Sequence, residues 1–85
     1  MKNGFIVEHE NKYWYKDDNL HREDGPACEF ANRDKAWYFE GKRHRVDGPA
    51  IECSNVKKAW YYQDKYIDCS SQQEFERLIK LIMFL

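Results

Sequence analysis

The chain contains the heptapeptide His44-Arg45-Val46-Asp47-Gly48-Pro49-Ala50, and a closely related copy, His21-Arg22-Glu23-Asp24-Gly25-Pro26-Ala27, starts 23 residues earlier. When residues 21–43 are aligned with residues 44–66 without a gap, 13 of the 23 positions are identical. Self-similarity at a fixed period is the signature of a repeat architecture. The sequence therefore predicts an array of similar structural units.

A third unit precedes these two, provided that two residues are removed from one of its loops. The aromatic segments that then align are Lys12-Tyr13-Trp14-Tyr15, Lys35-Ala36-Trp37-Tyr38 and Lys58-Ala59-Trp60-Tyr61. The same alignment places Ile6-Val7-Glu8 on Ala27-Cys28-Glu29 and on Ala50-Ile51-Glu52. Each unit thus has two segments of strand-forming residues joined by a polar loop, which is typical of a β-hairpin. We expect hairpin units at about residues 5–20, 21–43 and 44–66.

Turn-forming residues separate the predicted strands. Each aromatic segment is followed by Asp18, Gly41 or Asp64, residue types that tolerate positive φ or cap a turn through the side chain. Proline in the Asp-Gly-Pro motif lacks the N–H that a continuing strand would donate. We expect Asp24 and Asp47 to cap these turns and to pair with the nearby arginine or histidine.

A C-terminal helix is predicted for residues 71–84. Ser71-Gln72-Gln73-Glu74 has the spacing of a capping box, and apolar residues then recur at helical intervals. These residues are Phe75, Leu78, Ile79, Ile82 and Leu85. The predicted fold is one domain over residues 1–85, mainly β with one helix (α+β): a single-layer antiparallel meander of hairpins with the helix packed on one face. The apolar end Leu81–Leu85 is either additional core or a contact for a second copy of the chain.

Alternation along the strands divides the aromatic residues between two faces. Trp37, Phe39, Trp60 and Tyr62 point to one side, here called the Trp face. We expect Trp14, Trp37 and Trp60 to form a core ladder under the helix, the alternative being a platform on which bases stack. The opposite side, the Tyr face, is expected to carry Tyr15, Tyr38 and Tyr61 together with Glu8, Glu29 and Glu52. It is either an ordinary half-solvated sheet face or a binding surface.

The stretch from Trp37 to Ala50, which reads W-Y-x-x-G-K-x-H-R-x-D-G-P-A, resembles the repeats of MORN-like proteins. The resemblance covers about residues 6–80 and implies a β-hairpin array closed by a short helix. It further implies a surface for binding or scaffolding without a catalytic residue set, as in a phage accessory protein that inhibits a host protein such as a defence factor. The last unit departs from the pattern, with Asp64 for the turn glycine and Tyr66-Ile67-Asp68 for the basic segment.

Composition narrows the classes of function and location. The 14 basic and 15 acidic side chains nearly balance, so nucleic acid is not an expected partner. No signal peptide or membrane span is expected, because the longest apolar run is Leu81–Leu85. Cys28, Cys53 and Cys69 replace hydrophobic residues at non-equivalent repeat positions, which favours buried thiols in a reduced cytosol. We expect a cytoplasmic protein, in the host cytoplasm if it is viral.

No catalytic motif is evident. His21-Arg22 and His44-Arg45, each followed by an aspartate two residues on, superficially resemble a kinase catalytic loop, but no phosphate loop or metal-binding aspartate accompanies them. The histidines and cysteines lack the spacing of a metal site. We therefore expect no enzymatic activity, no metal and no cofactor.

The leading hypothesis is a protein-binding module that uses Tyr15, Tyr38, Tyr61, Glu29 and Glu52. The alternative is a small-ligand protein, for example for a nucleotide messenger. Its candidate residues are His21, Arg22, Arg43, His44 and Arg45, together with the tryptophans. A third possibility is a structural subunit that self-associates through the C-terminal helix.

Overall fold

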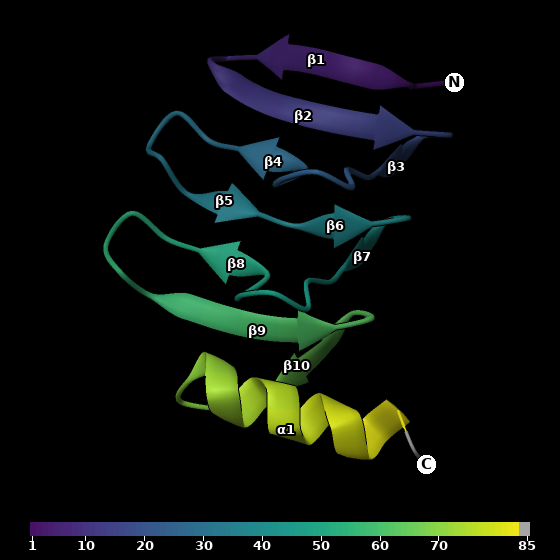
Figure 1. The fold of residues 1–85 in the computed structure, drawn as a ribbon. Coiled ribbons are helices and arrows are strands. Elements are labelled where there is room, and N and C mark those ends of the chain that lie inside the picture. The colour runs from purple at the N-terminus through teal and green to yellow at the C-terminus, as the bar shows by residue number, and fades with distance from the viewer. Residues whose placement is uncertain (84–85) are drawn as a thin grey trace.

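The structure, a computed structural model, describes residues 1–83 as an open antiparallel sheet followed by one helix, which confirms the predicted fold class (Figure 1). The first unit contains β1 (Gly4–Glu8), β2 (Asn11–Lys16) and β3 (Asn19–Leu20). The second contains β4 (Cys28–Glu29), β5 (Lys35–Ala36), β6 (Tyr38–Phe39) and β7 (Lys42–Arg43). The third contains β8 (Ile51–Glu52), β9 (Lys58–Tyr62) and β10 (Lys65–Ile67), and α1 spans Gln72–Met83. Phe84 and Leu85, included in the expected apolar end of the helix, lie outside the described residues.

The units stack in sequence order. Neighbouring strands follow the path β1-β2-β4-β5-β8-β9-β10, while β3 pairs with β2 and β6 with β7. At each junction the first strand of one unit pairs with the aromatic strand of the unit before it. Equivalent hydrogen bonds join Trp14 N to Ala27 O at 2.9 Å and Trp37 N to Ala50 O at 2.7 Å. The sequence repeat therefore corresponds to a repeated pattern of backbone hydrogen bonds between units.

Tight turns with left-handed backbone close the hairpins. Asp18, Gly41 and Asp64 have φ angles of 67°, 83° and 69°, which confirms the special position predicted for them. The residue before each, Asp17, Glu40 or Gln63, also has positive φ. Two such residues in succession give the type I′ turn, whose twist matches that of a hairpin. Successive turns are joined by hydrogen bonds, because Gly41 N donates to Leu20 O (2.9 Å) and Asp64 N to Arg43 O (2.8 Å).

The register of the first unit corrects the expected alignment. Opposite Lys12, Lys35 and Lys58 of the aromatic strands stand Val7, Glu29 and Glu52. Val7, and not Glu8, therefore occupies the position of the two glutamates, because the two-residue turn His9-Glu10 is shorter than the equivalent loops. A shift of one residue exchanges faces. Glu8 consequently lies on the Tyr face, whereas the placement of Glu29 and Glu52 there was wrong: both lie on the Trp face.

The helix packs at the end of the stack, along the last hairpin (Figure 1). Ser71 is its N-cap, since its Oγ accepts a hydrogen bond from Glu74 N at 3.2 Å. Phe75 and Ile79 pack against Trp60, with Tyr62, Ile67 and Cys69 at the margin. The indole Nε1 of Trp60 also donates to Gln72 Oε1 at 2.8 Å.

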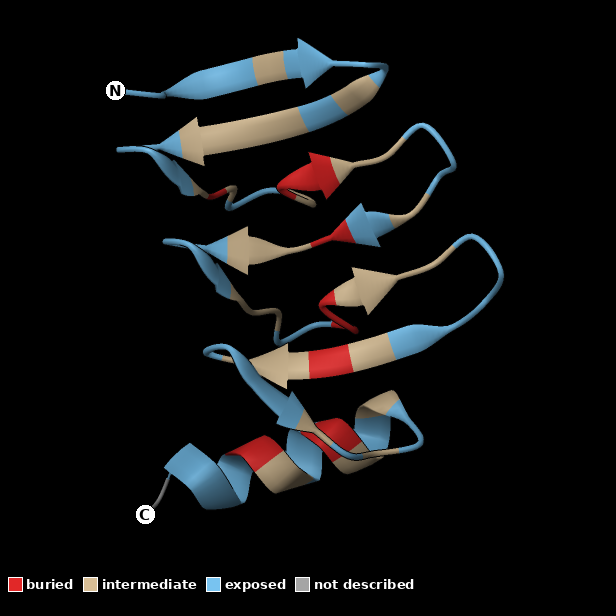
Figure 2. Cartoon of the chain, turned by 180° about the vertical axis from the view of Figure 1, so that it is seen from behind, coloured by how far each residue is buried: buried red, intermediate tan, exposed pale blue. Residues whose placement is uncertain are grey.

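The expected ladder of three tryptophans under the helix is wrong for two of them. Trp60 is buried against α1, whereas Trp14 and Trp37 are half-buried and are covered by arginines. The reason is width: a helix about 10 Å across, lying along strands about 4.8 Å apart, covers only about two of them. Figure 2 shows the buried residues on β4, β5 and β9, in the segments that precede β4 and β8, and on α1.

The stack is thin, with principal extents of 37 × 30 × 17 Å. Its buried residues outside the helix contact are mostly small, namely Ala27, Cys28, Ala36 and Ala50. Small residues let the strands of one layer and their connecting segments approach closely. Among residues 1–83, no helix has the length and apolar character needed to cross a membrane.

Candidate functional site

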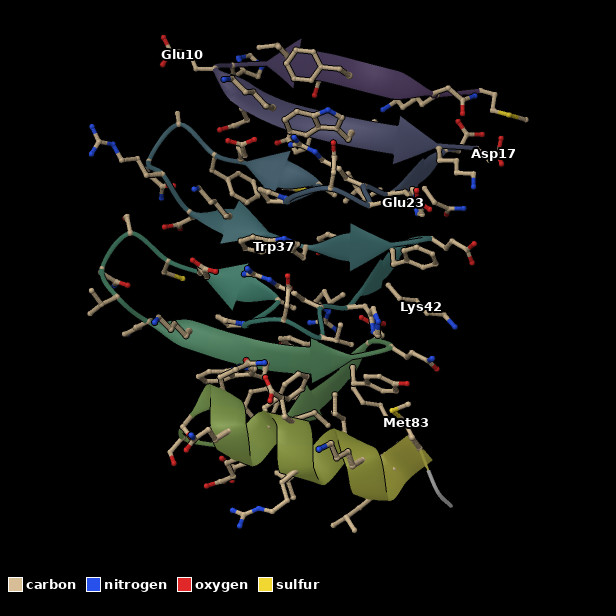
Figure 3. The ribbon with its side chains drawn as sticks, in the orientation of Figure 1. Glu10, Asp17, Glu23, Trp37, Lys42 and Met83 are labelled. Atoms are coloured by element: carbon tan, nitrogen blue, oxygen red, sulfur yellow. The ribbon has the colours of Figure 1, made fainter. Side chains whose placement is uncertain are left out.

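Two arginines lie flat on tryptophan rings of the Trp face. The guanidinium carbon of Arg22 is 4.0 Å from the ring centroid of Trp14, and that of Arg45 is 3.8 Å from the centroid of Trp37. These are close cation–π contacts. Trp37 lies in the middle of the stack (Figure 3). Each of these two basic residues, which the sequence offered to a ligand, thus already contacts the tryptophan of the preceding unit.

Each arginine is also bonded to acidic groups. Arg22 Nε donates to Asp24 at 2.9 Å, and Arg22 Nη1 donates to Pro26 O at 3.2 Å and to Glu29 at 3.3 Å. Arg45 repeats this set with Asp47 at 2.9 Å, Pro49 O at 3.1 Å and the carboxylate of Glu52. We call Trp14, Arg22, Asp24 and Glu29, with their counterparts Trp37, Arg45, Asp47 and Glu52, the arginine stacks. The predicted pairing of both aspartates with arginine is confirmed.

A glycine lies directly beside each guanidinium. A Cβ placed on Gly25 would lie 3.0 Å from Arg22 Cζ, and one placed on Gly48 would lie 2.6 Å from Arg45 Cζ. A side chain at Gly48 would therefore displace the arginine from its tryptophan. The Asp-Gly-Pro motif supplies a carboxylate, a space and a carbonyl to the same guanidinium.

The Nδ1 atom of each histidine bonds the start of a unit to the tight turn near the end of the same unit. His21 Nδ1 accepts a hydrogen bond from Glu40 N at 2.9 Å, and His44 Nδ1 accepts one from Gln63 N at 3.0 Å. Each ring also lies against an aromatic residue of the next turn, with centroids 4.5 Å apart for His21 and Phe39. Both nitrogens must be unprotonated to accept these bonds. The two imidazoles therefore contribute to the packing within the second and third units.

The free energy of unfolding at acidic pH should depend on His44. Burial lowers the pKa of His44 below its ordinary 6.5, so the unfolded chain binds a proton more readily than the folded one. The free energy of unfolding should then decrease as the pH falls through 6.5 and level off below the folded pKa. Urea unfolding between pH 8 and pH 5 would measure this slope. His44→Asn, which keeps an acceptor without a titration in this range, should show a smaller slope; an unchanged slope would exclude His44 as its source.

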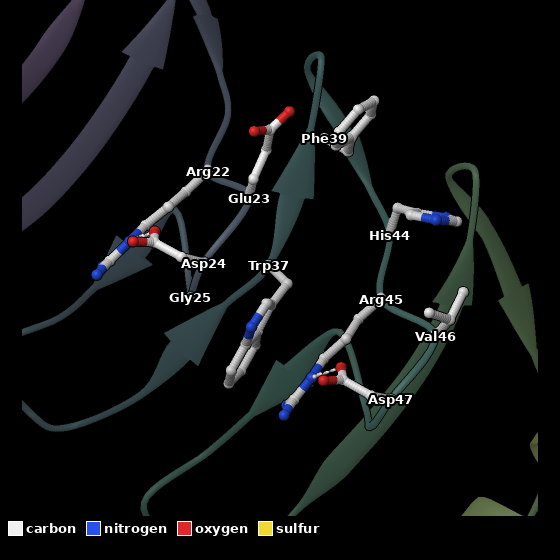
Figure 4. Close-up of a pocket in the computed structure, with 10 residues that line it drawn as sticks. All are labelled: Arg22, Glu23, Asp24, Gly25, Trp37, Phe39, His44, Arg45, Val46 and Asp47. Atoms are coloured by element: carbon white, nitrogen blue, oxygen red, sulfur yellow. Dashed lines mark hydrogen bonds and ion pairs between the residues drawn. The ribbon is translucent and has the colours of Figure 1, made fainter.

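A cavity of about 610 Å³ lies between the two arginine stacks (Figure 4). Trp37, Phe39 and His44 line it, as do the carboxylates of Glu23, Asp24 and Asp47. Its two arginines are already paired with carboxylates. The cavity therefore offers a phosphate group little uncompensated positive charge, which counts against the nucleotide alternative.

The Tyr face carries one tyrosine from each unit in the same orientation. Tyr15, Tyr38 and Tyr61 are all half-buried. Arg43 lies 4.3 Å from the ring centroid of Tyr61 and pairs with Asp64 at 2.7 Å. Burial raises the pKa of Tyr38, so its phenol keeps the proton and can both donate and accept a hydrogen bond at neutral pH.

The structure thus divides the predicted binding residues between two faces. Tyr15, Tyr38, Tyr61 and Arg43 lie on the Tyr face; His21, Arg22, Glu29, His44, Arg45 and Glu52 lie on the Trp face. Sequence reasoning missed that each arginine and the glutamate seven residues later form a pair. The signal was present, because both residues recur at the same spacing in two units. Gln72, which bonds Trp60, carried no such signal.

The cysteines give no indication of chemistry. Burial raises the pKa of the Cys28 thiol to about 11, which keeps it protonated and unreactive at neutral pH. All three cysteines are free, and Cys28 is buried. In the part of the chain that the structure describes, no group of three histidine, cysteine, aspartate or glutamate residues could hold a metal ion.

Comparison of the chain with protein-family models, curated proteins and solved structures found no match. The resemblance to MORN-like repeats therefore stays a prediction, and the function rests on the geometry of the two faces.

Proposed function

We propose that this chain is a non-enzymatic interaction module whose Tyr face binds a protein. The observation that carries the proposal is the row of one half-exposed tyrosine per unit on the face opposite α1. Tyrosine is enriched at protein interfaces and at the positions that dominate their affinity. The resemblance to MORN-like repeats is consistent with this role. The proposed module would suit an accessory protein that inhibits a host protein.

The size of the face supports the proposal. The broad dimensions of the stack, 37 × 30 Å, enclose an area on the order of 1,000 Å², and a standard interface buries about 800 Å² per partner. Equivalent tyrosines are separated by two strand spacings, or about 10 Å. A partner can therefore contact all three units at once.

Two of the three tyrosine rings, those of Tyr15 and Tyr61, are also held in place before a partner arrives. Arg43 lies over Tyr61, Tyr66 is in edge contact with Tyr61 at a centroid distance of 5.6 Å, and Lys2 Nζ lies 5.0 Å from the Tyr15 centroid. Side chains ordered in advance lose less conformational entropy on binding. Arg43 is paired with Asp64, so the cationic group left beside a ring is Lys2 at Tyr15, which favours an acidic or aromatic side chain of the partner there.

Double substitution Tyr38→Ala and Tyr61→Ala should abolish specific capture of the partner by the tagged chain, with each change costing at least about tenfold in affinity. Affinity purification followed by calorimetry on the recovered protein would measure the loss. The matched control is Lys35→Ala with Lys58→Ala, since each of these exposed residues lies three positions before one of the two tyrosines but on the Trp face. Full binding by a folded double tyrosine variant would refute the Tyr face as the site.

A further inference from the structure

Strand β1 leaves one edge of the sheet open. Among residues 1–83, no strand pairs with β1 on the side away from β2. In the second and third units the corresponding edges, those of β4 and β8, pair with the aromatic strand of the preceding unit. The equivalent strand edge is therefore paired in the second and third units and unpaired in the first.

The free hydrogen-bonding groups of this edge belong to Phe5 and Val7. Trp14 directs its N–H to Ala27 and its C=O to His21, away from β1. Phe5, which stands opposite Trp14, is thus in a non-hydrogen-bonded pair whose own N–H and C=O point outward. Val7, two residues on, repeats this orientation. Two donors and two acceptors are presented in line.

Between Gly4 and Val7 the open edge carries none of the charged side chains that usually protect one. Phe5 and Val7 are 54% and 55% exposed and lie together on the Trp face. Val7 stands where the other units have a glutamate, so β1 supplies no carboxylate at this position. The start of β1 is nevertheless fixed, because Asp18 N donates to Lys2 O at 2.9 Å and Asp17 N to Asn3 Oδ1 at 2.9 Å. The edge is a preformed apolar strand.

We infer that two copies of the chain associate by antiparallel pairing of β1 with β1. With Ile6 opposite Ile6, Phe5 of each copy stands opposite Val7 of the other, and their outward groups form four hydrogen bonds. The Glu8 end of each strand then lies beside the Gly4 end of the other, where Lys2 Nζ is near Tyr15. The segment is thus complementary to itself in backbone, in apolar contact and in charge.

This pairing produces a closed assembly. It is a two-fold contact in which each copy uses the same surface, so it ends at two copies. Each outer end of the joined sheet is then the hairpin β9–β10, against which α1 packs. The Tyr faces of the two copies become one continuous surface, because the sheet continues across the junction.

Sedimentation equilibrium on the full chain should give a species of twice 10.4 kDa. Val7→Pro should weaken this association at least about tenfold, because proline removes the outward N–H without removing a bond to β2. The comparison variant is Leu81→Ala with Met83→Ala, which changes the exposed apolar residues of α1. A monomer at all concentrations, or a dimer weakened by the α1 variant and not by Val7→Pro, would overturn the inference.

Amide hydrogen exchange provides a second readout. Protection of the Phe5 and Val7 amides should increase with protein concentration, while that of Ile6, already directed toward β2, should not. Circular dichroism would establish that Val7→Pro is folded. If Val7→Pro is not folded, a substitution at the exposed Glu8 replaces it. Glu8→Lys places a like charge near Lys2 of the second copy and should weaken the dimer. Association unaffected by Glu8→Lys, together with concentration-independent exchange at Phe5 and Val7, would contradict pairing through β1.

Discussion

Replacing Phe75 with alanine should lower the free energy of unfolding by about 3–5 kcal/mol, the range for truncating a buried phenylalanine. Phe75 is fully buried, and it packs with Ile79 against Trp60. This contact is the main apolar cluster of a thin stack, so few other contacts can compensate for the cavity. Urea unfolding followed by tryptophan fluorescence and by circular dichroism would measure the change. The two signals should separate if α1 detaches before the sheet unfolds.

Leu81→Ala is the matched control for Phe75→Ala. It removes an apolar side chain from the same helix, but Leu81 is 63% exposed, and the expected change is within about 0.5 kcal/mol. Equal effects of the two substitutions would contradict the packing described for α1.

Replacing Arg45 with alanine should destabilise the protein by about 2–3 kcal/mol. The loss of one partner from a buried ion pair costs about 3–5 kcal/mol, and the loss of an exposed pair at most about 1 kcal/mol. The pair of Arg45 and Glu52 lies between these cases, with side chains 19% and 35% exposed. The contact with Trp37 adds to the cost. Urea unfolding measures the change.

Two further variants separate the contributions of Arg45. Arg45→Lys keeps the charge but loses the planar group that stacks on Trp37 and bonds in two directions, so it should recover less than half of the loss. Arg77→Ala, an exposed arginine of α1, should have an effect within about 0.5 kcal/mol. Full recovery by lysine would show that charge alone matters at this position.

Much of the fold could be predicted from the sequence, because the repeat supplied several independent copies of each signal. The positive φ of Asp18, Gly41 and Asp64 followed from turn chemistry, and the start of α1 followed from Ser71 as a cap. The faces of the glutamates could not be predicted. They depend on whether a turn contains two residues or more, and one residue of difference moves a side chain through the sheet.

The candidate site was harder to predict than the fold. The sequence placed Arg22 and Arg45 near tryptophans, but it did not show that carboxylates within the arginine stacks neutralise their charge. The residues contact each other only after the segment following β3 or β7 folds back over the aromatic strand. The tyrosines of the Tyr face could be placed, because simple alternation along a strand determines their side.

Asp68 stands 23 residues after Arg45, at the position that an arginine stacking on Trp60 would occupy. Among the described residues no arginine covers Trp60, which instead packs against Phe75 and bonds Gln72 of the terminal helix. The aromatic strand of each earlier unit pairs with the first strand of the next unit, whereas the last hairpin is covered by α1. A second copy of residues 35–57, which is 23 residues long, could be inserted before Lys58. This insertion would leave the contact between the last hairpin and α1 unchanged. The sheet can therefore be lengthened by whole repeats, while the residues that end it are needed only in one copy.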